Sequence, residues 1–462
     1  MSVAALAQPA WQRLGLGVLS QVIPPGLIDD AVAATGVGQR RVRLLPARVV
    51  VLFTLAMVVF STDGYRQVWR NLMSGWPVLD RVTPTRSAFT QARRRLGPAP
   101  LAWLFVRVRG VRGDERTPGV FAFGLRLVSW DGTMLHVPDS PANAAAFIRS
   151  TGGGGNVGGY PQVRLMALIE CGTRAVIDAV FGAQSEQALA DKLVPSLAPG
   201  MLLLADRNFV GFPQWAAIRA QGAHAVWRLG AHRIFPVHAV LPDGSWHSRF
   251  TPAKADRDRG VQPIPVRVLR YRITVDRVDR RGRRTTRTET IRLLTSLLDP
   301  AQAPAADLAA CYRQRWESEN SYQELKTWLR GPSVILRSHD PDGLHQELWA
   351  HLIVYQALRH LIADTASEYH LDPDTLPFLT CLRTARTTVI NLAITSGQAL
   401  TNALTRLADH LLDDEHQRRP GRDNHRAGKQ RRKPYTTKKP DMTSGTSTYT
   451  ITITDPKAKE SA

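Results

Sequence analysis

The sequence has few cysteines, and they show no metal-binding spacing. Its 462 residues contain three, Cys171, Cys311 and Cys381, which lie far apart and form no CxxC or Cys/His pattern. Such sparse cysteine usage is typical of a reducing cytoplasm. It argues against a disulfide framework and against a structural zinc site.

No apolar run is long enough to cross a bilayer. The most hydrophobic stretch, ARVVVLFTLAMVVF, occupies residues 47–60, whereas a spanning helix needs about 20 residues. This stretch therefore predicts a buried helix. The N-terminus has neither a charged n-region nor a clean cleavage site, so we expect a cytoplasmic protein.

Lysine is scarce although the chain is strongly basic. The formal net charge is +21, yet the only lysines before residue 429 are Lys192, Lys254 and Lys326. Arginine suits bidentate phosphate contacts, although a GC-rich genome would produce the same bias without a functional cause. The charge predicts a polyanionic partner and a basic tail.

The first part of the chain has a helical pattern. Amphipathic and apolar helical stretches fill residues 20–115 and predict a small helical N-terminal domain over residues 1–118. Three successive arginines at 93–95 should spread around the surface of one of its helices. A packing or dimerisation domain and a DNA-binding domain fit this pattern about equally well.

The rest of the chain alternates strand and helix patterns and then becomes polar. An α/β domain is predicted over residues 119–230 and again over 305–365, interrupted by a β-rich insertion at 231–304. A C-terminal helical region at 366–415 follows. Residues 416–462 are basic and poor in apolar side chains, so we expect a disordered tail.

Two aspartates follow predicted strands of the α/β domain. Asp131 comes after LRLVSW and Asp206 after MLLLA. Carboxylates at the ends of adjacent strands, joined by a third from a packed helix, can hold two divalent cations. Glu319 is the natural third ligand, and Asp139 in the following loop is an alternative to Asp131.

The segment YRQRWESENSYQELK at 312–326 contains no Gly or Pro and predicts a helix. At about 100° per residue, Tyr312, Arg315, Glu319 and Lys326 share one narrow stripe of that helix. Taken alone, the stripe is more typical of an ordinary salt-bridged face than of a site for metal and phosphate.

The two aspartates together with the spacing on this helix resemble the pattern of the DDE transposases of the insertion element 4 family. Tyr312, Arg315, Glu319 and Lys326 are separated by two, three and six residues, as in the family's Tyr–Arg–Glu–Lys signature. WDGT and ADRNF resemble the stretches around its two aspartates, and residues 20–105 are similar to its N-terminal domain. The resemblance covers roughly residues 20–360.

The resemblance implies an α/β, RNase H-like catalytic domain with a β-rich insertion, preceded by a small all-α DNA-binding domain. It implies that Mg²⁺, with Mn²⁺ as a substitute, is held by Asp131, Asp206 and Glu319. It also implies DNA-backbone contacts near the cut by Tyr312, Arg315 and Lys326. Trp246, in the insertion, is implied to stack on an extruded base, although plain packing is the more common role of such a tryptophan.

The implied function is that of a DNA transposase of a bacterial insertion sequence. It would cleave double-stranded DNA at terminal inverted repeats and transfer the freed 3′ ends to target DNA by a cut-and-paste mechanism. We expect a homodimer in a synaptic complex, a cytoplasmic, nucleoid-associated location and no membrane. The alternatives are a metal-dependent nuclease without strand transfer and an inactive derivative that only binds DNA ends.

Overall fold

The structure of the chain is a computed structural model. It describes residues 14–38, 44–74, 83–149, 159–278, 284–331, 335–391, 397–415, 422–423 and 445–453. The chain forms two compact units. The first contains Met1–Pro118, Gly132–Leu189 and Ser318–His416, and the second contains Gly119–Asp131, Ala190–Glu317 and Gln417–Ala462. Within the described residues, no helix is long and apolar enough to cross a membrane.

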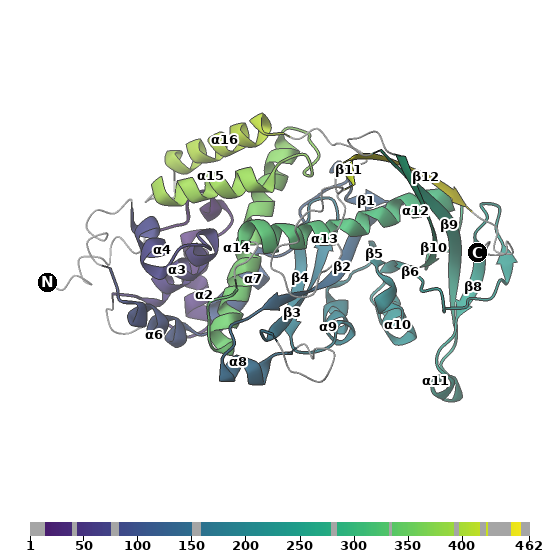
Figure 1. The fold of residues 1–462 in the computed structure, drawn as a ribbon, viewed down its shortest axis with the longest axis horizontal. Helices are drawn as coiled ribbons and strands as arrows, with labels where there is room; N and C mark the ends of the chain where they lie inside the picture. The colour runs from purple at the N-terminus through teal and green to yellow at the C-terminus, as the bar shows by residue number, and fades with distance from the viewer. Residues whose placement is uncertain are drawn as a thin grey trace. The chain divides into compact units, whose positions relative to one another are not determined.

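The first unit is mainly helical (Figure 1). Its helices are η1 (Gly17–Gln21), α2 (Pro25–Ala34), α3 (Ala47–Val59), α4 (Tyr65–Met73), α6 (Arg86–Leu96), α7 (Ala99–Val108), α8 (Pro141–Ala146), α14 (Pro341–Glu368), α15 (Phe378–Asn391) and α16 (Gln398–Asp413). In α3 every residue except Arg48 is buried, which confirms the prediction of a buried helix. The long helix α14 packs on both α3 and α7.

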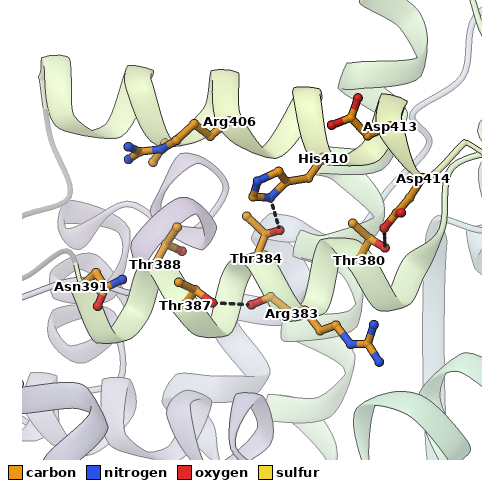
Figure 2. Close-up of a pocket in the computed structure, with 11 residues that line it drawn as sticks. Thr380, Arg383, Thr384, Thr387, Thr388, Asn391, Arg406, His410, Asp413 and Asp414 are labelled. Carbon is orange, nitrogen blue, oxygen red and sulfur yellow. Dashed lines mark hydrogen bonds between the residues drawn. The ribbon is translucent and has the colours of Figure 1, made fainter.

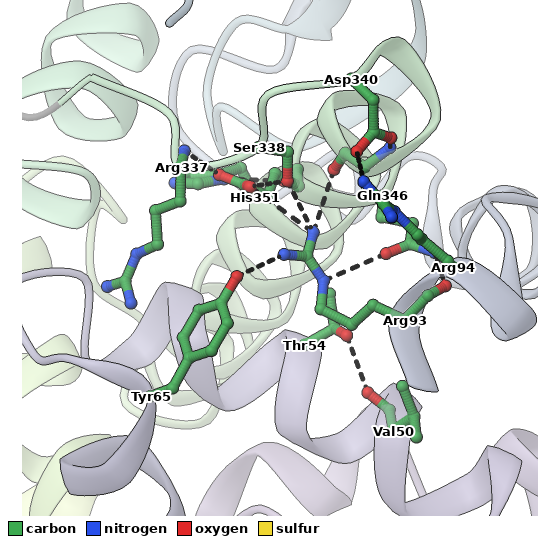
Figure 3. Close-up of polar contacts among 12 residues, drawn as sticks. Val50, Thr54, Tyr65, Arg93, Arg94, Arg337, Ser338, Asp340, Gln346 and His351 are labelled. Atoms are coloured by element: carbon green, nitrogen blue, oxygen red, sulfur yellow. Dashed lines mark hydrogen bonds and ion pairs between the residues drawn. The ribbon is translucent and has the colours of Figure 1, made fainter. Parts of the chain in front are cut away.

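The three successive arginines of α6 do not all face solvent, contrary to our expectation. Arg93 is 5% exposed. Its guanidinium donates to Tyr65 Oη at 2.8 Å, Ser338 Oγ at 3.0 Å and Gln346 Oε1 at 3.1 Å (Figure 3). The side chain of Arg94, by contrast, is 69% exposed. Arg93 thus fastens α6 to α14 and to the loop before it, because it lies on the buried face of its helix.

The α/β region is built around a sheet of strands. They are β1 (Phe121–Ala122), β2 (Leu125–His136), β3 (Gln162–Glu170), β4 (Val176–Gly182), β5 (Met201–Ala205) and β6 (His224–Arg228). The order is β2–β3–β4 in the first unit and β6–β5–β2 in the second, and β2 runs through both. β5 is parallel to β2 and to β6, whereas β3 and β4 are antiparallel.

Short helices connect these strands. They are α9 (Glu186–Leu193), η2 (Val194–Ser196), η3 (Arg207–Phe209) and α10 (Phe212–Ala220). A parallel pair such as β5 and β6 needs a crossover connection, and α10 supplies it. The mixed sheet with crossover helices confirms the α/β class.

The β-rich insertion belongs to the second unit. Its elements are β7 (Ala239–Val240), β8 (Trp246–Phe250), α11 (Lys254–Asp258), β9 (Ile264–Val278) and β10 (Arg284–Thr295). β9 and β10 form a long antiparallel hairpin, and β10 also pairs with β6 of the α/β domain. The insertion therefore extends the sheet. Helix α12 (Ala305–Cys311) then leads into the segment that carries the signature.

Part of the predicted disordered tail is a strand. β12 (Gly445–Ile453) pairs antiparallel with β9, from Thr446 opposite Val278 to Ile453 opposite Tyr271, and β11 (Arg422–Asp423) pairs with β12. The sequence GTSTYTITI is rich in β-branched residues, which favour strands. The basic composition of the surrounding tail hid this signal. Residues 416–421, 424–444 and 454–462 of the predicted tail lie outside the described residues.

Candidate active site

Two of the predicted metal ligands occupy equivalent positions on neighbouring strands of the second unit. The parallel pairing of β2 with β5 ends with Ser129 opposite Leu204. Asp131 and Asp206 each follow two residues later, and Asp206 is still extended, with φ −77° and ψ 166°. Side chains two residues apart on a strand share a face, and paired strands lie about 4.8 Å apart. The two carboxylates therefore start from the same level and the same face.

We had expected Asp131 at the end of its strand, but it lies within β2. The strand continues to His136, but its pairing with β5 stops at Ser129 because β5 ends at Ala205. The next residue is Gly132, where a Cβ would collide with the carboxylate of Glu186 in α9. In this conformation the glycine of WDGT leaves room for that carboxylate, which is the end of a flexible side chain and could shift for a larger residue.

The loop that carries Asp206 is tied to β2. Asp206 caps the 3₁₀-helix η3, and its carboxylate accepts a hydrogen bond from the backbone N–H of Arg207. Phe209 at the end of η3 packs on Trp130, with ring centroids 5.7 Å apart. Since Trp130 directly precedes Asp131, the two acidic residues share one buried aromatic support.

Tyr312 and Arg315 also belong to the second unit and reach the same two strands. They lie in η4 (Tyr312–Arg315), a 3₁₀-helix in which side chains three residues apart eclipse each other. The Tyr312 hydroxyl donates to the carbonyl of Ala205 at 3.1 Å. The Arg315 Nη1 atom lies 3.8 Å from Asp131 Oδ2, and its guanidinium is 5.4 Å from the centre of the Trp316 ring.

Tyr312 is a buried residue, with 6% of its surface exposed. Burial raises the pKa of Tyr312 above its ordinary value, so the phenol stays protonated and can donate. Its hydroxyl is engaged by the end of β5, next to Asp206. This arrangement assigns Tyr312 an internal contact, and its contact with DNA stays an untested prediction.

The segment 312–326 is helical, as predicted, but it is not one regular α-helix. The 3₁₀-helix η4 is followed by α13 (Trp316–Gln323) and by a π-helix, η5 (Glu324–Leu329). The 100° rule behind the predicted stripe therefore applies only to α13. Glu319 lies in α13 and Lys326 in η5, and both belong to the first unit.

Within the first unit, Lys326 has a defined partner. Its ammonium donates to Thr133 Oγ1 at 2.8 Å. Tyr322, in the preceding turn, accepts a hydrogen bond from the backbone N–H of Ala167 in β3 at 3.0 Å. Glu319 is half-buried. The helical segment that carries Glu319 is thus fixed to β3 through Tyr322 and to β2 through Lys326.

The carboxylates in the second unit fit a divalent metal ion. Asp131 and Asp206 supply hard oxygen donors side by side, the ligand type that Mg²⁺ and related ions prefer. In the part of the chain that the structure describes, no group of three or more His, Cys, Asp or Glu side chains is arranged to hold a metal. Glu319, the predicted third ligand, lies in the other unit.

Two further predicted residues are placed clearly. Trp246 in β8 is 5% exposed, pairs with Val268 and has no hydrogen-bond partner for its Nε1 among the described residues. Its burial favours the packing alternative, because stacking on a base would require the indole to leave the core. Asp139 forms an ion pair with Arg149, as Asp131 does with Arg315, so this contact does not decide which of the two is the first metal ligand.

A cavity of about 720 Å³ lies away from these residues, between α15 and α16 of the first unit (Figure 2). Thr384 and His410 meet across it, with 3.1 Å between Oγ1 and Nδ1. None of the predicted site residues lines it. Arginines and aspartates both contribute to its wall, so no sign of charge prevails.

Comparison with known proteins defines the class. The family model described as "Transposase DDE domain" matches residues 122–357, which include every predicted site residue. Together with the strand order around β2, this match identifies an RNase H-like catalytic domain of a DDE transposase, an enzyme that acts on DNA and depends on divalent metal. The fold and the enzyme class predicted from the sequence are thereby confirmed.

A second match narrows the family. "Insertion element 4 transposase N-terminal" matches residues 13–106. The chain is 28% identical over 350 residues to the Escherichia coli (strain K12) transposase InsG for insertion sequence element IS4, covering 75% of this chain and 77% of InsG. The chain belongs to the insertion element 4 family of transposases.

Two further similarities were found, one over a shorter stretch of sequence and one to a solved structure. InsZ, an Escherichia coli (strain K12) protein whose name also assigns it to the transposases, is 32% identical over 148 residues, covering 32% of this chain and 50% of InsZ. A piggyBac transposase, solved in a synaptic complex with hairpin DNA, has a TM-score of 0.41 at 10% identity, covering 89% of this chain and 88% of that one.

The sequence did not reveal which groups Lys326 and Tyr312 contact, namely Thr133 and the Ala205 carbonyl. Thr133 stands two residues after Asp131 on the same strand, so the period of two could have marked it as a neighbour of the site. The use of the Ala205 carbonyl by Tyr312 left no signal in the sequence, because any residue supplies a backbone carbonyl.

Proposed function

We propose that this transposase moves its element by a cut-and-paste mechanism. It cleaves double-stranded DNA at the terminal inverted repeats and joins the freed 3′ ends to target DNA. The observation that carries the proposal is the equivalent placement of Asp131 and Asp206 on two parallel, paired strands. The intact Tyr–Arg–Glu–Lys signature supports it.

In this proposal Asp131, Asp206 and Glu319 hold the divalent ions, Mg²⁺ with Mn²⁺ as a substitute. Bound ions of this kind activate a water or a 3′-hydroxyl and stabilise the leaving oxygen of a phosphodiester. The protein keeps the carboxylates oriented through its own contacts. Arg315 lies 3.8 Å from Asp131, and the Arg207 N–H donates to Asp206.

Arg315 and Lys326 are the proposed phosphate contacts. Lys326 is half-exposed and donates to a neutral hydroxyl, that of Thr133. An ammonium can form a charge-assisted hydrogen bond with a phosphate oxygen. Arg315 can exchange its carboxylate partner for phosphate, and a guanidinium suits bidentate contact. Tyr312 would support Asp206 by holding the end of β5.

The remaining parts of the proposal concern DNA recognition and assembly. The N-terminal helices recognise the terminal repeat, with exposed arginines such as Arg94 and Arg95 facing the DNA. Two copies of the chain hold two DNA ends in a synaptic complex. The reaction takes place in the cytoplasm of a prokaryote, at the nucleoid.

The test is an end-cleavage assay with the purified chain, Mg²⁺, a labelled duplex that carries the terminal repeat, and target plasmid. The proposal predicts a nick with a 3′-hydroxyl at the repeat boundary, followed by joining of that end to the plasmid. Nicks without joining would indicate a nuclease. Specific binding without nicks would indicate an inactive end-binding derivative.

A further inference from the structure

The helix that carries Glu319 changes its winding directly after α13. Residues Glu324–Leu329 form the π-helix η5, and Lys326 is its third residue. π-helical turns are rare and occur frequently at functional sites. Since an α-helix is the more stable winding, specific contacts must hold these residues in place.

Glu324, the first residue of η5, provides those contacts. It is 8% exposed. Its Oε1 accepts from Arg174 Nη1 at 2.7 Å and from Arg359 Nη2 at 3.1 Å, and its Oε2 accepts from the Tyr355 hydroxyl at 3.1 Å. Both oxygens of a buried carboxylate are therefore bound, by the β3–β4 turn on one side and by α14 on the other.

Stability alone does not explain such a cluster. Replacing a buried ion pair by apolar residues is often neutral or stabilising, because the desolvation of the charges offsets their attraction. Arg174 also adopts a positive φ of 58°, a left-handed conformation that is uncommon outside glycine. Backbone strain of this kind persists where surrounding contacts require one conformation.

The contacts of Glu324 bear on the direction in which the Lys326 side chain leaves η5. Glu324 precedes Lys326 by two residues, and Leu325 and Leu329 of the same π-helix are buried as well. The winding of η5 thus decides where the Lys326 stem leaves the helix to reach Thr133. We propose that Glu324 is a positioning residue for strand cleavage, which with Arg174 and Arg359 holds Lys326 beside Thr133. The catalytic part of this proposal rests on the proposed function.

The first measurement does not depend on activity. Glu324→Gln keeps the shape and removes the charge. Lysines of the full chain are labelled briefly with an amine-reactive reagent and quantified by mass spectrometry, in wild type and variant. We expect Lys326 labelling to rise severalfold in the variant, while the exposed Lys192 and Lys254 serve as unchanged internal standards. Unchanged labelling of Lys326 would overturn the proposal.

A matched control separates positioning from the loss of a buried charge. Glu347 is 3% exposed, lies in α14 of the same unit, and contacts Arg93 and the backbone N–H of Arg337. Glu347→Gln should leave Lys326 labelling unchanged even if it lowers the melting temperature. Tyr355→Phe, which removes a single donor to Glu324, should raise the labelling in the same direction but less. Equal effects of the Glu347 and Glu324 variants on labelling would contradict the proposal.

The second measurement is a double-mutant cycle on end cleavage. Glu324→Gln should slow cleavage roughly ten- to hundredfold, as expected for a misplaced catalytic contact, with binding of the repeat retained. If Glu324 acts through Lys326, the double variant with Lys326→Ala should cleave no more slowly than Lys326→Ala alone. Multiplication of the two losses would overturn the assignment. A wild-type chain that does not cleave contradicts the proposed function, while the labelling result still decides on Glu324.

Discussion

In the proposed reaction Arg315 has two anionic partners, the Asp131 carboxylate and a DNA phosphate. In the structure its guanidinium faces the Asp131 carboxylate at 3.8 Å. The two side chains are only 10% and 21% exposed, so solvent screens this pair less than a surface pair. In the proposed reaction a divalent cation competes with Arg315 for the Asp131 carboxylate, and the guanidinium then turns to a phosphate. Lys326 donates to a neutral hydroxyl, that of Thr133.

Lys326 gives the first prediction. Lys326→Ala should slow nicking of a labelled terminal-repeat duplex by roughly ten- to hundredfold, because a cation near the developing charge is lost. Lys326→Arg should recover only part of the rate, since the planar guanidinium cannot take the place of a compact ammonium beside Thr133. Single-turnover rates measure both effects.

The matched control for Lys326 is Lys192→Ala, a change at an exposed lysine in α9. It should nick at the wild-type rate. Full activity of Lys326→Ala would refute the phosphate-contact assignment and would leave Lys326 with a packing role on β2.

At the scale of elements, the sequence predicted the existence of most helices and strands but not how they are wound or buried. The period of two and the helix period revealed β2, β5 and the helix from 312 onward. They could not reveal that this helix passes from 3₁₀ through α to π winding, because winding depends on tertiary contacts such as those of Glu324. The strand β12 was missed for a related reason, since its partner β9 lies more than 150 residues earlier in the sequence.

The arginines of α6 show the same limit and give the second prediction. A run of three arginines looks like a basic surface, but the turn of the helix places Arg93 on the buried side. Arg93→Ala should lower the free energy of unfolding by about 3 kcal/mol or more, because it leaves Glu347 and Ser338 without their buried cationic partner. Arg94→Ala should change it by less than about 0.5 kcal/mol. Urea unfolding followed by circular dichroism measures both.

Equal losses of unfolding free energy in the Arg93 and Arg94 variants would contradict the structure. A destabilised Arg93 variant with unchanged binding of the terminal repeat, corrected for the folded fraction, would further assign Arg93 to packing and leave DNA contact to its exposed neighbours.

At the scale of the whole molecule, part of the charge of +21 comes from arginines that are engaged inside the protein. Arg93, Arg174 and Arg359 are engaged in ion pairs inside the first unit. The basic stretch between residues 416 and 440 instead occurs in an apolar-poor sequence. Net charge is therefore a poor guide to where DNA binds, and the third prediction separates the two regions.

Neutral substitutions of the Lys and Arg residues between 416 and 440 should weaken binding to all DNA and flatten its salt dependence, because fewer counterions are released. This design keeps β12, which a deletion of 416–462 would remove from β9. Neutralising Arg94 and Arg95 should instead reduce the preference for the terminal repeat. Titrations at several salt concentrations, on repeat and unrelated duplexes, test both. A tail variant that loses only repeat preference would reverse the assignment.

The central claim is that Asp131, Asp206 and Glu319 act together as metal ligands for DNA cleavage. Single-turnover nicking of a labelled terminal-repeat duplex in Mg²⁺, compared between wild type and Asp131→Asn, Asp206→Asn and Glu319→Gln, tests it most directly. Each change removes a charge at nearly constant shape, so we predict no nicking above background, with the fold and repeat binding intact. Asp139→Asn, which removes the alternative ligand, should nick as wild type does. Nicking at the wild-type rate by any of the three variants would contradict the account.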